Sequence, residues 1–393
     1  MAWSYIVAGA RTPIGKLGGA LASLSAADLG GLAIKAALQR AGVAPDEVEH
    51  VLMGQVLMAG QGQVPSRQAA VKAGIPMSVP SVNINKVCLS GLNTIYLADQ
   101  MIAAGDADIV IAGGMESMSN APYLAQGART GYRYGNAELA DSIIADGLWC
   151  AFDACLMGLG TERYNGGGIT REEQDEIAVK SNERAANAIK DGRFADEITP
   201  VSVPQKRSDP ILVETDEGVR PGTTMESLAT LRPAFDKDGT ITAANASQIS
   251  DGGCALVMMS ERAVNARGAT PLGQVVGYGM VAGPENPSLL HQPSRAIAAA
   301  LARVGKSVGD IDLFEINEAF AAVGIASMRD LGVGDDVVNV NGGAIALGHP
   351  IGMSGNRLAL TLLHELRRRG GSLGAAALCG GGGQGDALLV RSL

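Results

Sequence analysis

The feature that most restricts the fold of this chain is an internal repeat. Several features of its first third reappear, in the same order, in its last third. In each copy a helical pattern ends at a glycine and leads into an apolar strand, a Val-Asn-x-Asn segment follows, a Ser-Gly pair opens a second helix, and a strand runs into consecutive glycines. The matched segments are residues 36–51 with 299–314, 82–85 with 338–341, 90–91 with 354–355, and 109–114 with 377–381. A single short match means little, but matches in one shared order indicate a duplicated α/β unit.

Strands and helices alternate within each copy, which predicts mixed or parallel sheets with helices on their faces. A chain of 393 residues is also too long for one ordinary core. We therefore predict an N-terminal half made of residues 1–118 and 250–270, a C-terminal half of residues 271–393, and an inserted loop domain of residues 119–249. The insertion contains an amphipathic helix near 175–190, introduced by a capping box at Thr170 and Glu173. A segment of this kind can cover a site.

Composition excludes several classes of protein. The formal net charge is -9, and no run of Lys and Arg is longer than residues 367–369, so nucleic-acid binding is not expected. No apolar run reaches the roughly 18 residues of a membrane helix, and no basic segment precedes the apolar start, so neither membrane insertion nor a targeting peptide is expected. The 5 cysteines are scattered and odd in number, which predicts a reduced, cytoplasmic protein.

Cys88, His349 and Cys379 are the residues that could carry chemistry. Cys88 precedes the helix that opens at Ser90, where backbone N–H groups and the helix dipole favour a thiolate. His349 stands at the equivalent place in the second copy. If a pseudo-twofold axis relates the halves, the two helix N-termini approach each other and Cys88 faces His349. A buried structural cysteine and a turn histidine are the ordinary alternatives, and the shared position in the repeat favours the functional interpretation.

Cys379 opens a glycine turn, residues 380–385, that formally fits G-x-G-x-x-G. A dinucleotide site is rejected because a strand pattern, not a helix, follows the turn. The turn instead offers free N–H groups for an oxyanion hole. Asn317 follows a predicted buried strand, where it could orient a water molecule, bind an enolate oxygen or cap a helix. A zinc site made of the two thiols and His349 lacks any Cys-x-x-Cys pair, so we expect no metal.

Four motifs together resemble the thiolase family over essentially the whole chain. They are residues 85–91, 317–322, 341–352 and the glycine turn that begins at Cys379. The resemblance implies a five-layer αβαβα fold with a loop domain over a coenzyme A site. It also implies a homotetramer built as a dimer of dimers and no tightly bound cofactor, with coenzyme A serving as substrate and product.

The resemblance further implies roles for individual residues. Cys88 would be the acylated nucleophile, His349 the base that activates it, and Cys379 the group that deprotonates a second acetyl-CoA. Asn317 would hold a water that forms one oxyanion hole with His349, and the N–H groups of Cys88 and Gly381 would form another. The implied contacts to coenzyme A and its acyl chain are Arg220, Ser227, Ala234, Phe235, Ser247, Met157 and Phe320. At Leu156 the chain departs from the family, because many acetoacetyl-CoA thiolases have a histidine there.

The implied activity is the reversible condensation of two acetyl-CoA molecules to acetoacetyl-CoA, as in bacterial acetyl-CoA acetyltransferases. The alternative within the family is a broader-chain 3-ketoacyl-CoA thiolase of fatty-acid β-oxidation. A decarboxylating ketoacyl synthase on the same fold is disfavoured, since it generally uses a second histidine where this chain has Asn317. A non-catalytic lipid carrier could have lost Cys88, His349 or Cys379, yet all three are present.

Overall fold

The computed structural model describes residues 3–393, in which ten strands form one hydrogen-bonded sheet. These strands are β1 Ser4–Arg11, β2 Gly15–Lys16, β3 His50–Gly54, β4 Ser81–Ile84, β5 Ile109–Ser117, β12 Ser250–Ser260, β13 Gly273–Ala282, β14 Leu313–Ile316, β15 Leu373–Gly380 and β16 Gln384–Ser392. The first half-sheet runs β4-β3-β5-β12-β1, and the second runs β14-β15-β16-β13. The two halves join where Tyr5 and Ile6 pair with Gln274 and Gly273.

The two half-sheets share one pattern of pairing, which confirms the predicted duplication. In the first half β3 pairs in parallel with β5, β5 pairs antiparallel with β12, and β12 pairs antiparallel with β1. In the second half β14 pairs in parallel with β15, β15 pairs antiparallel with β16, and β16 pairs antiparallel with β13. Strands that correspond in sequence therefore occupy corresponding places in space.

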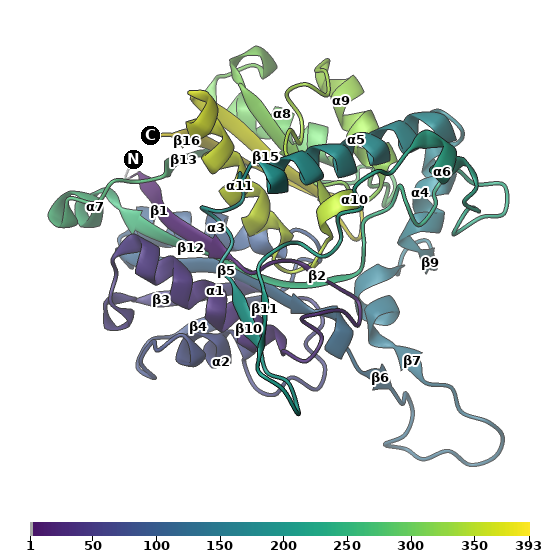
Figure 1. The fold of residues 1–393 in the computed structure, drawn as a ribbon, viewed down its shortest axis with the longest axis horizontal. Coiled ribbons are helices and arrows are strands. Elements are labelled where there is room, and N and C mark those ends of the chain that lie inside the picture. The colour runs from purple at the N-terminus through teal and green to yellow at the C-terminus, as the bar shows by residue number, and fades with distance from the viewer. Residues whose placement is uncertain (1–2) are drawn as a thin grey trace.

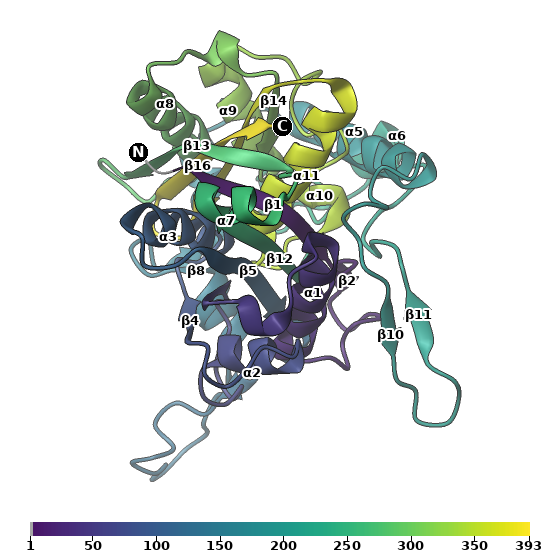
Figure 2. The ribbon, with the colours of Figure 1, turned by 90° about the vertical axis from the view of Figure 1, so that its left-hand side faces the viewer.

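Helices cover both outer faces of the half-sheets and fill the space between them (Figures 1 and 2). Those of the two halves are α1 Ala26–Ala41, α2 Pro65–Lys72, α3 Ser90–Ala104, α7 Glu261–Arg267, α8 Gln292–Val304, α9 Ala321–Leu331, α10 Ala344–Leu347 and α11 Ser354–Arg369. Helices α1 and α2 lie on the outside of the first half-sheet, and α8 and α9 lie on the outside of the second. Because α3 and α11 lie between the half-sheets, the order of layers is the expected αβαβα.

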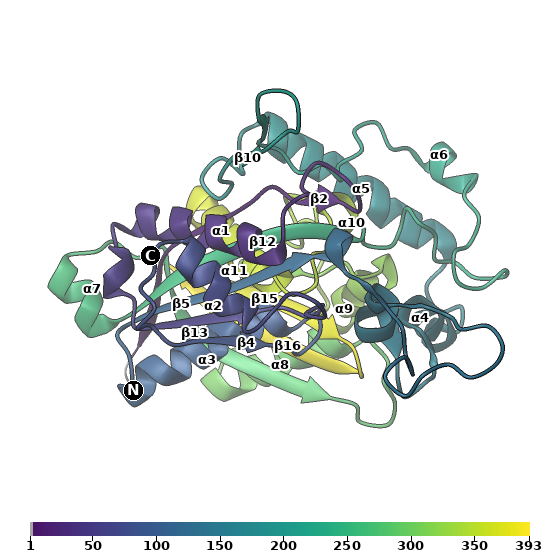
Figure 3. The ribbon, with the colours of Figure 1, turned by 90° about the horizontal axis from the view of Figure 1, so that it is seen from below.

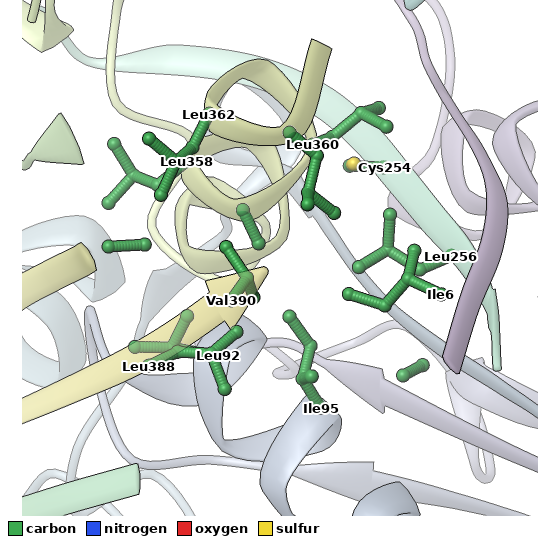
Figure 4. Close-up of a cluster of buried hydrophobic side chains, with 14 of the residues drawn as sticks. Ile6, Leu92, Ile95, Cys254, Leu256, Leu358, Leu360, Leu362, Leu388 and Val390 are labelled. Carbon is green, nitrogen blue, oxygen red and sulfur yellow. The ribbon is translucent and has the colours of Figure 1, made fainter. Parts of the chain in front are cut away.

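The middle layer is the largest apolar cluster of the protein (Figure 4). Leu92 of α3 and Leu358 of α11 are fully buried in it, together with Leu256 of β12 and Leu388 of β16. A helix enclosed by two sheets needs apolar residues on more than one face. This packing fixes α3 and α11 against each other, and the N-terminus of each helix lies next to a predicted catalytic residue.

Glycines end the helices of both copies as predicted. Helices α1 and α8 end at Gly42 and Gly305, with φ of 62° and 64°. Helices α3 and α11 end at Gly105 and Gly370, with φ of 80° and 70°. A left-handed residue after the last turn lets the backbone N–H bond back to helix carbonyls, and glycine adopts that conformation without steric cost.

The second copy departs from the first at residues 338–341. Residues 81–84 form β4, whereas Val338 makes only an isolated parallel bridge to Phe314. Asn339 has φ of 48°, which is incompatible with an extended strand. Its side-chain amide accepts from Ile316 N–H at 2.8 Å and donates to Ile316 C=O at 2.8 Å. The side chain thus replaces the ladder that a backbone strand would have made.

The segment between β5 and β12 carries short elements around one long helix. They are β6 Tyr123–Leu124, β7 Ala140–Asp141, a π-helical segment Ile143–Leu148, β8 Trp149–Cys150, β9 Cys155–Leu156, α4 Met157–Asn165, α5 Arg171–Lys190, β10 Val201–Val203, β11 Ile211–Val213 and α6 Met225–Ala229. The capping box of Thr170 and Glu173 is present, and it starts α5 one turn earlier than the apolar pattern indicated. The β6–β7 loop and the β10–β11 hairpin project from the body (Figures 2 and 3).

A buried arginine ties this segment to the first half-sheet. Arg11 of β1 bonds Glu197 through Nε at 2.7 Å and Asp216 through Nη1 at 2.7 Å and Nη2 at 2.9 Å. The side chains of Arg11 and Asp216 are fully enclosed, and that of Glu197 is 1% exposed.

Replacing Arg11 by methionine should lower the free energy of unfolding by about 3–5 kcal/mol, because two buried carboxylates lose their counter-charge. The measurement is urea denaturation followed by circular dichroism. Lys72→Met is the matched control, since Lys72 pairs with Asp28 at the surface and such pairs contribute about 1 kcal/mol or less. A loss in Arg11→Met no larger than in the control would contradict this role.

Candidate active site

Cys88 lies in a strained turn between β4 and α3. The residue before it, Val87, has φ of 51°, which is rare for a β-branched side chain. Two neighbours hold this backbone. Asn85 Oδ1 accepts from Val87 N–H at 3.0 Å, while Ser90 Oγ accepts from Lys86 N–H at 2.9 Å and donates to Val87 C=O at 2.6 Å. Strain that is held in place by its surroundings is typical of functional turns.

The thiol of Cys88 is protonated in the resting protein. Burial raises its pKa to about 12, although hydrogen bonds from the backbone N–H groups of Cys88 and Gly381 act in the opposite direction. The backbone N–H groups thus favour the thiolate, as predicted, but the effect of desolvation on the pKa is larger. Cys88 needs a base to become a nucleophile.

His349 has the tautomer that a base requires. The Ser354 hydroxyl donates to Pro350 C=O at 2.9 Å, so it accepts the hydrogen bond from His349 Nδ1 at 2.6 Å. The lone pair is then on Nε2, which lies 3.4 Å from Asn317 Nδ2. Burial, assisted by the positive charge of Arg357, lowers the pKa of His349 to about 3. The imidazole is therefore neutral, and its Nε2 carries no proton.

The N-termini of α3 and α11 meet at the junction of the halves, as predicted. A side chain at Gly91 would collide with Asn356, and one at Gly355 would collide with Leu92. Beyond the helix starts, Cys88 and Ile351 belong to one apolar cluster. The structure thus brings the cysteine turn and the histidine turn to the same place from opposite halves.

A buried carboxylate lies at this junction. Glu116 of β5 accepts from the N–H groups of Val56, Leu57 and Gly352 at 2.9, 3.1 and 3.0 Å. Burial raises its pKa to about 7, although these three hydrogen bonds act in the opposite direction. Glu116 thereby holds the loop after β3 and the histidine turn together.

Cys379 is at the end of β15 and has no exposed surface. Burial, and then the proximity of Cys88, raises the pKa of the Cys379 thiol above its usual range. The glycine turn after it packs on the nucleophile turn, since side chains at Gly380 and Gly381 would meet Leu89 and Val87. The two thiols are therefore neighbours.

Asn317 lies beside these groups without capping a helix. It follows β14, and its N–H donates to Ala377 C=O of β15 at 2.9 Å. Helix α9 begins four residues later, after Phe320, so the alternative role as an N-cap is excluded. Within residues 3–393, Asn317 Oδ1 is buried and accepts no hydrogen bond, which leaves it free to bind a polar group.

A cavity of about 540 Å³ opens beside His349. Its wall includes six of the seven residues predicted to contact coenzyme A, namely Met157, Arg220, Ala234, Phe235, Ser247 and Phe320. Ser227 does not line it. That residue is exposed on α6, where it forms a capping box with Thr224. Lys16 and Arg220 bring positive charge to a wall that is otherwise largely apolar, and Leu156 adds to the apolar part.

Sequence reasoning missed Ser354, Glu116, Lys16 and also Gln248, whose backbone C=O accepts from His349 N–H at 3.1 Å. A signal for Ser354 was present in the repeat, because Ser90 has the same position in the first copy and also bonds the turn before its helix. Glu116, Lys16 and Gln248 carry no comparable signal, since their positions depend on contacts between distant segments.

Two neighbouring thiols, a neutral imidazole and a pair of converging N–H groups define an enzyme that transfers acyl groups through cysteine. No cluster of His, Cys, Asp or Glu within residues 3–393 has the arrangement of a metal site. The family model described as "Thiolase, N-terminal domain" matches residues 4–262, and that described as "Thiolase, C-terminal domain" matches residues 269–392. The chain belongs to the thiolase family.

Curated relatives match over their full length. A "Probable acetyl-CoA acetyltransferase" of Mycolicibacterium smegmatis is 56% identical over 98% of this chain and 100% of its own length. The "Acetyl-CoA acetyltransferase" of Cupriavidus necator is 52% identical over 98% of both chains, and that of Shinella zoogloeoides is 49% identical over 99% of both. Among residues 3–393, the structure has no helix with the length and apolarity needed to cross a membrane.

Proposed function

We propose that this protein is an acetyl-CoA acetyltransferase, which condenses two acetyl-CoA molecules to acetoacetyl-CoA and coenzyme A and also runs in reverse. The observation that carries the proposal is the convergence of Cys88, Cys379 and the N–H groups of Cys88 and Gly381 at one junction. A single thiol suffices to accept an acyl group, whereas a second thiol beside it supplies the base for carbon–carbon bond formation. The names of the full-length relatives support the same substrate.

The first step is acetyl transfer to Cys88. His349 Nε2 takes the thiol proton, the sulfur attacks the thioester carbonyl, and the N–H groups of Cys88 and Gly381 stabilise the oxyanion. The carbon–sulfur bond to coenzyme A then breaks, and the leaving thiolate takes the proton from His349. The products are acetyl-Cys88 and free coenzyme A.

The second step forms the carbon–carbon bond. His349, neutral again after coenzyme A has left, takes the proton of Cys379. The Cys379 thiolate then removes an α-proton from a second acetyl-CoA, and the resulting enolate attacks the acetyl carbonyl of Cys88. His349 and a water held by Asn317 would stabilise the enolate oxygen. The bond from Cys88 to the acetyl carbon breaks, and the Cys88 sulfur takes the proton held by His349, while Cys379 keeps the α-proton and is a thiol again. Acetoacetyl-CoA is released.

The 540 Å³ cavity has the properties of a site for the pantetheine arm of coenzyme A. Its apolar wall suits the arm, and Arg220 suits the phosphates at the far end. Coenzyme A enters and leaves as substrate and product, and no tightly bound cofactor is required. Leu156 makes the cavity wall more apolar than a histidine would. Acyl-CoA substrates with chains longer than acetyl should therefore be tested as well.

We also propose a cytoplasmic homotetramer, a dimer of dimers, that serves fatty-acid metabolism. The arm between β6 and β7 supports assembly, because it projects from the body and exposes Tyr132, Tyr134 and Leu139 (Figure 1). All five cysteines are unpaired within residues 3–393, as a reducing compartment requires.

Steady-state kinetics of the purified protein test the proposal. In the cleavage direction with acetoacetyl-CoA and coenzyme A, a covalent acetyl-enzyme predicts parallel lines in double-reciprocal plots. Intersecting lines, or no acetyl-CoA formed, would contradict it. A series of longer 3-ketoacyl-CoA substrates separates the acetyl-specific enzyme from the broader-chain alternative.

A further inference from the structure

An ion pair connects the nucleophile turn to the opposite half of the protein. Lys86, two residues before Cys88, places Nζ at 2.7 and 3.0 Å from the two carboxylate oxygens of Asp386. Asp386 is on β16 and is fully buried, while the Lys86 side chain is 21% exposed. The two residues are separated by 300 positions in the sequence.

Asp386 is held rigidly by neighbours other than Lys86. The Tyr278 hydroxyl of β13 donates to Asp386 Oδ2 at 2.6 Å, and Asn93 Nδ2 of α3 lies 3.5 Å from the same atom. Tyr278 in turn stacks on Tyr96 of α3 with ring centroids 4.6 Å apart. The position of the Asp386 carboxylate is therefore set by its neighbours, and Lys86 of the first half bonds to it there.

The same strand carries the glycine turn. In the β15–β16 hairpin Asp386 pairs with Leu378, and the next pair is Gly385 with Cys379. Gly381 follows in the turn of this hairpin and packs on the nucleophile turn, because a side chain there would meet Val87, and its N–H acts to lower the pKa of Cys88. Lys86 therefore anchors the cysteine turn to the hairpin that supplies the second N–H donor.

We propose that Lys86 and Asp386 form a positioning pair that sets the separation between the N–H groups of Cys88 and Gly381, the two donors of a split oxyanion hole. This inference rests on the proposed acetyl transfer. The two donors come from different halves, so their spacing needs a contact across the junction. Val87 also has a strained φ, and a strained turn keeps its conformation only when surrounding contacts hold it in place.

The variant Lys86→Met tests the inference. It keeps the unbranched chain out to the ε position and removes the charged Nζ, and Tyr278 and Asn93 still bond Asp386. Displacing one donor by an ångström can cost about 100-fold in rate, so we expect single-turnover acetylation of Cys88 by acetyl-CoA to slow by about 10- to 100-fold. The KM for acetyl-CoA should change little, because Lys86 is not part of the cavity wall.

Alkylation of Cys88 by iodoacetamide separates positioning from general damage. This displacement forms no oxyanion, so its rate in Lys86→Met should stay within about threefold of wild type while acetylation falls. Equal losses in both reactions, or no loss in either, would overturn the inference. Lys86→Arg retains the charge and should recover most of the acetylation rate.

Lys180→Met is the matched control, because Lys180 pairs with Asp335 at 2.6 Å away from the nucleophile turn, and we expect wild-type acetylation from it. Equal slowing in this control would overturn the assignment to Lys86. If wild-type protein is itself not acetylated, the proposed function is refuted and the inference with it, whereas normal acetylation in Lys86→Met refutes the inference alone.

Discussion

Replacing Cys88 by alanine should abolish the acetyl-enzyme and lower acetyl transfer by roughly 10⁴-fold or more, the scale of loss when a covalent nucleophile is removed. The reason is geometric as well as chemical. Gly381 packs on the turn that carries Cys88, so a thioester carbonyl attacked by Cys88 lies beside the N–H groups of both residues. The measurements are incorporation of radiolabelled acetyl groups after mixing with acetyl-CoA, and the steady-state rate.

Cys254→Ala is the control for this variant. Cys254 is fully buried in the middle apolar layer away from the cavity, so the control should retain activity. Stoichiometric labelling of Cys88→Ala would assign the nucleophile to another residue and defeat the mechanism.

Replacing Cys379 by serine should separate the two halves of the reaction. Cys88 keeps its base and its N–H donors, so acetylation should proceed at close to the wild-type rate. Condensation should fall by roughly 10²–10⁴-fold, the range that a positioned acid–base group contributes, because a hydroxyl is a far weaker acid than a thiol and does not form the required anion. Radiolabel incorporation reports the first step, and formation of acetoacetyl-CoA reports the second.

The comparison of the two steps in Cys379→Ser supplies its own control, since intact acetylation shows that the site is folded. An unchanged condensation rate would remove Cys379 from the mechanism. A parallel loss of both steps would mean that Cys379 supports the site structurally, through its contact with the nucleophile turn.

Much of the fold could be predicted from the sequence, because the patterns that indicate it are local or occur twice. The helix ends at Gly42, Gly105, Gly305 and Gly370 follow from the tolerance of glycine for positive φ, and the order of matched segments predicted the paired half-sheets. Prediction failed at Asn339, where a side chain replaces the backbone ladder that the matching Val-Asn-x-Asn segment makes in the first half. Residues 82–85 and 338–341 have nearly the same sequence, and they differ in structure because their surroundings differ.

Some features of the candidate site could likewise be predicted from the sequence, and others could not. Cys88, His349 and Cys379 were predicted from their places in the repeat, and most of the cavity residues were predicted from the thiolase resemblance. Glu116 was missed because its three N–H partners come from two segments far apart in the sequence, the loop after β3 and the histidine turn. The effect of the N–H groups on the pKa of Cys88 was predicted, but the larger opposite effect of burial was not, because a sequence does not show desolvation.

The sequence by itself determined the duplicated α/β architecture and the identity of the reactive side chains, because periodicity, glycine positions and residue chemistry are properties of neighbouring residues. Only the tertiary structure decided the protonation of Cys88, the tautomer of His349 and the pairing of Lys86 with Asp386. The physical reason is that burial and hydrogen bonding depend on which distant segments meet, and the enclosed junction of the two halves is formed only when the chain has folded.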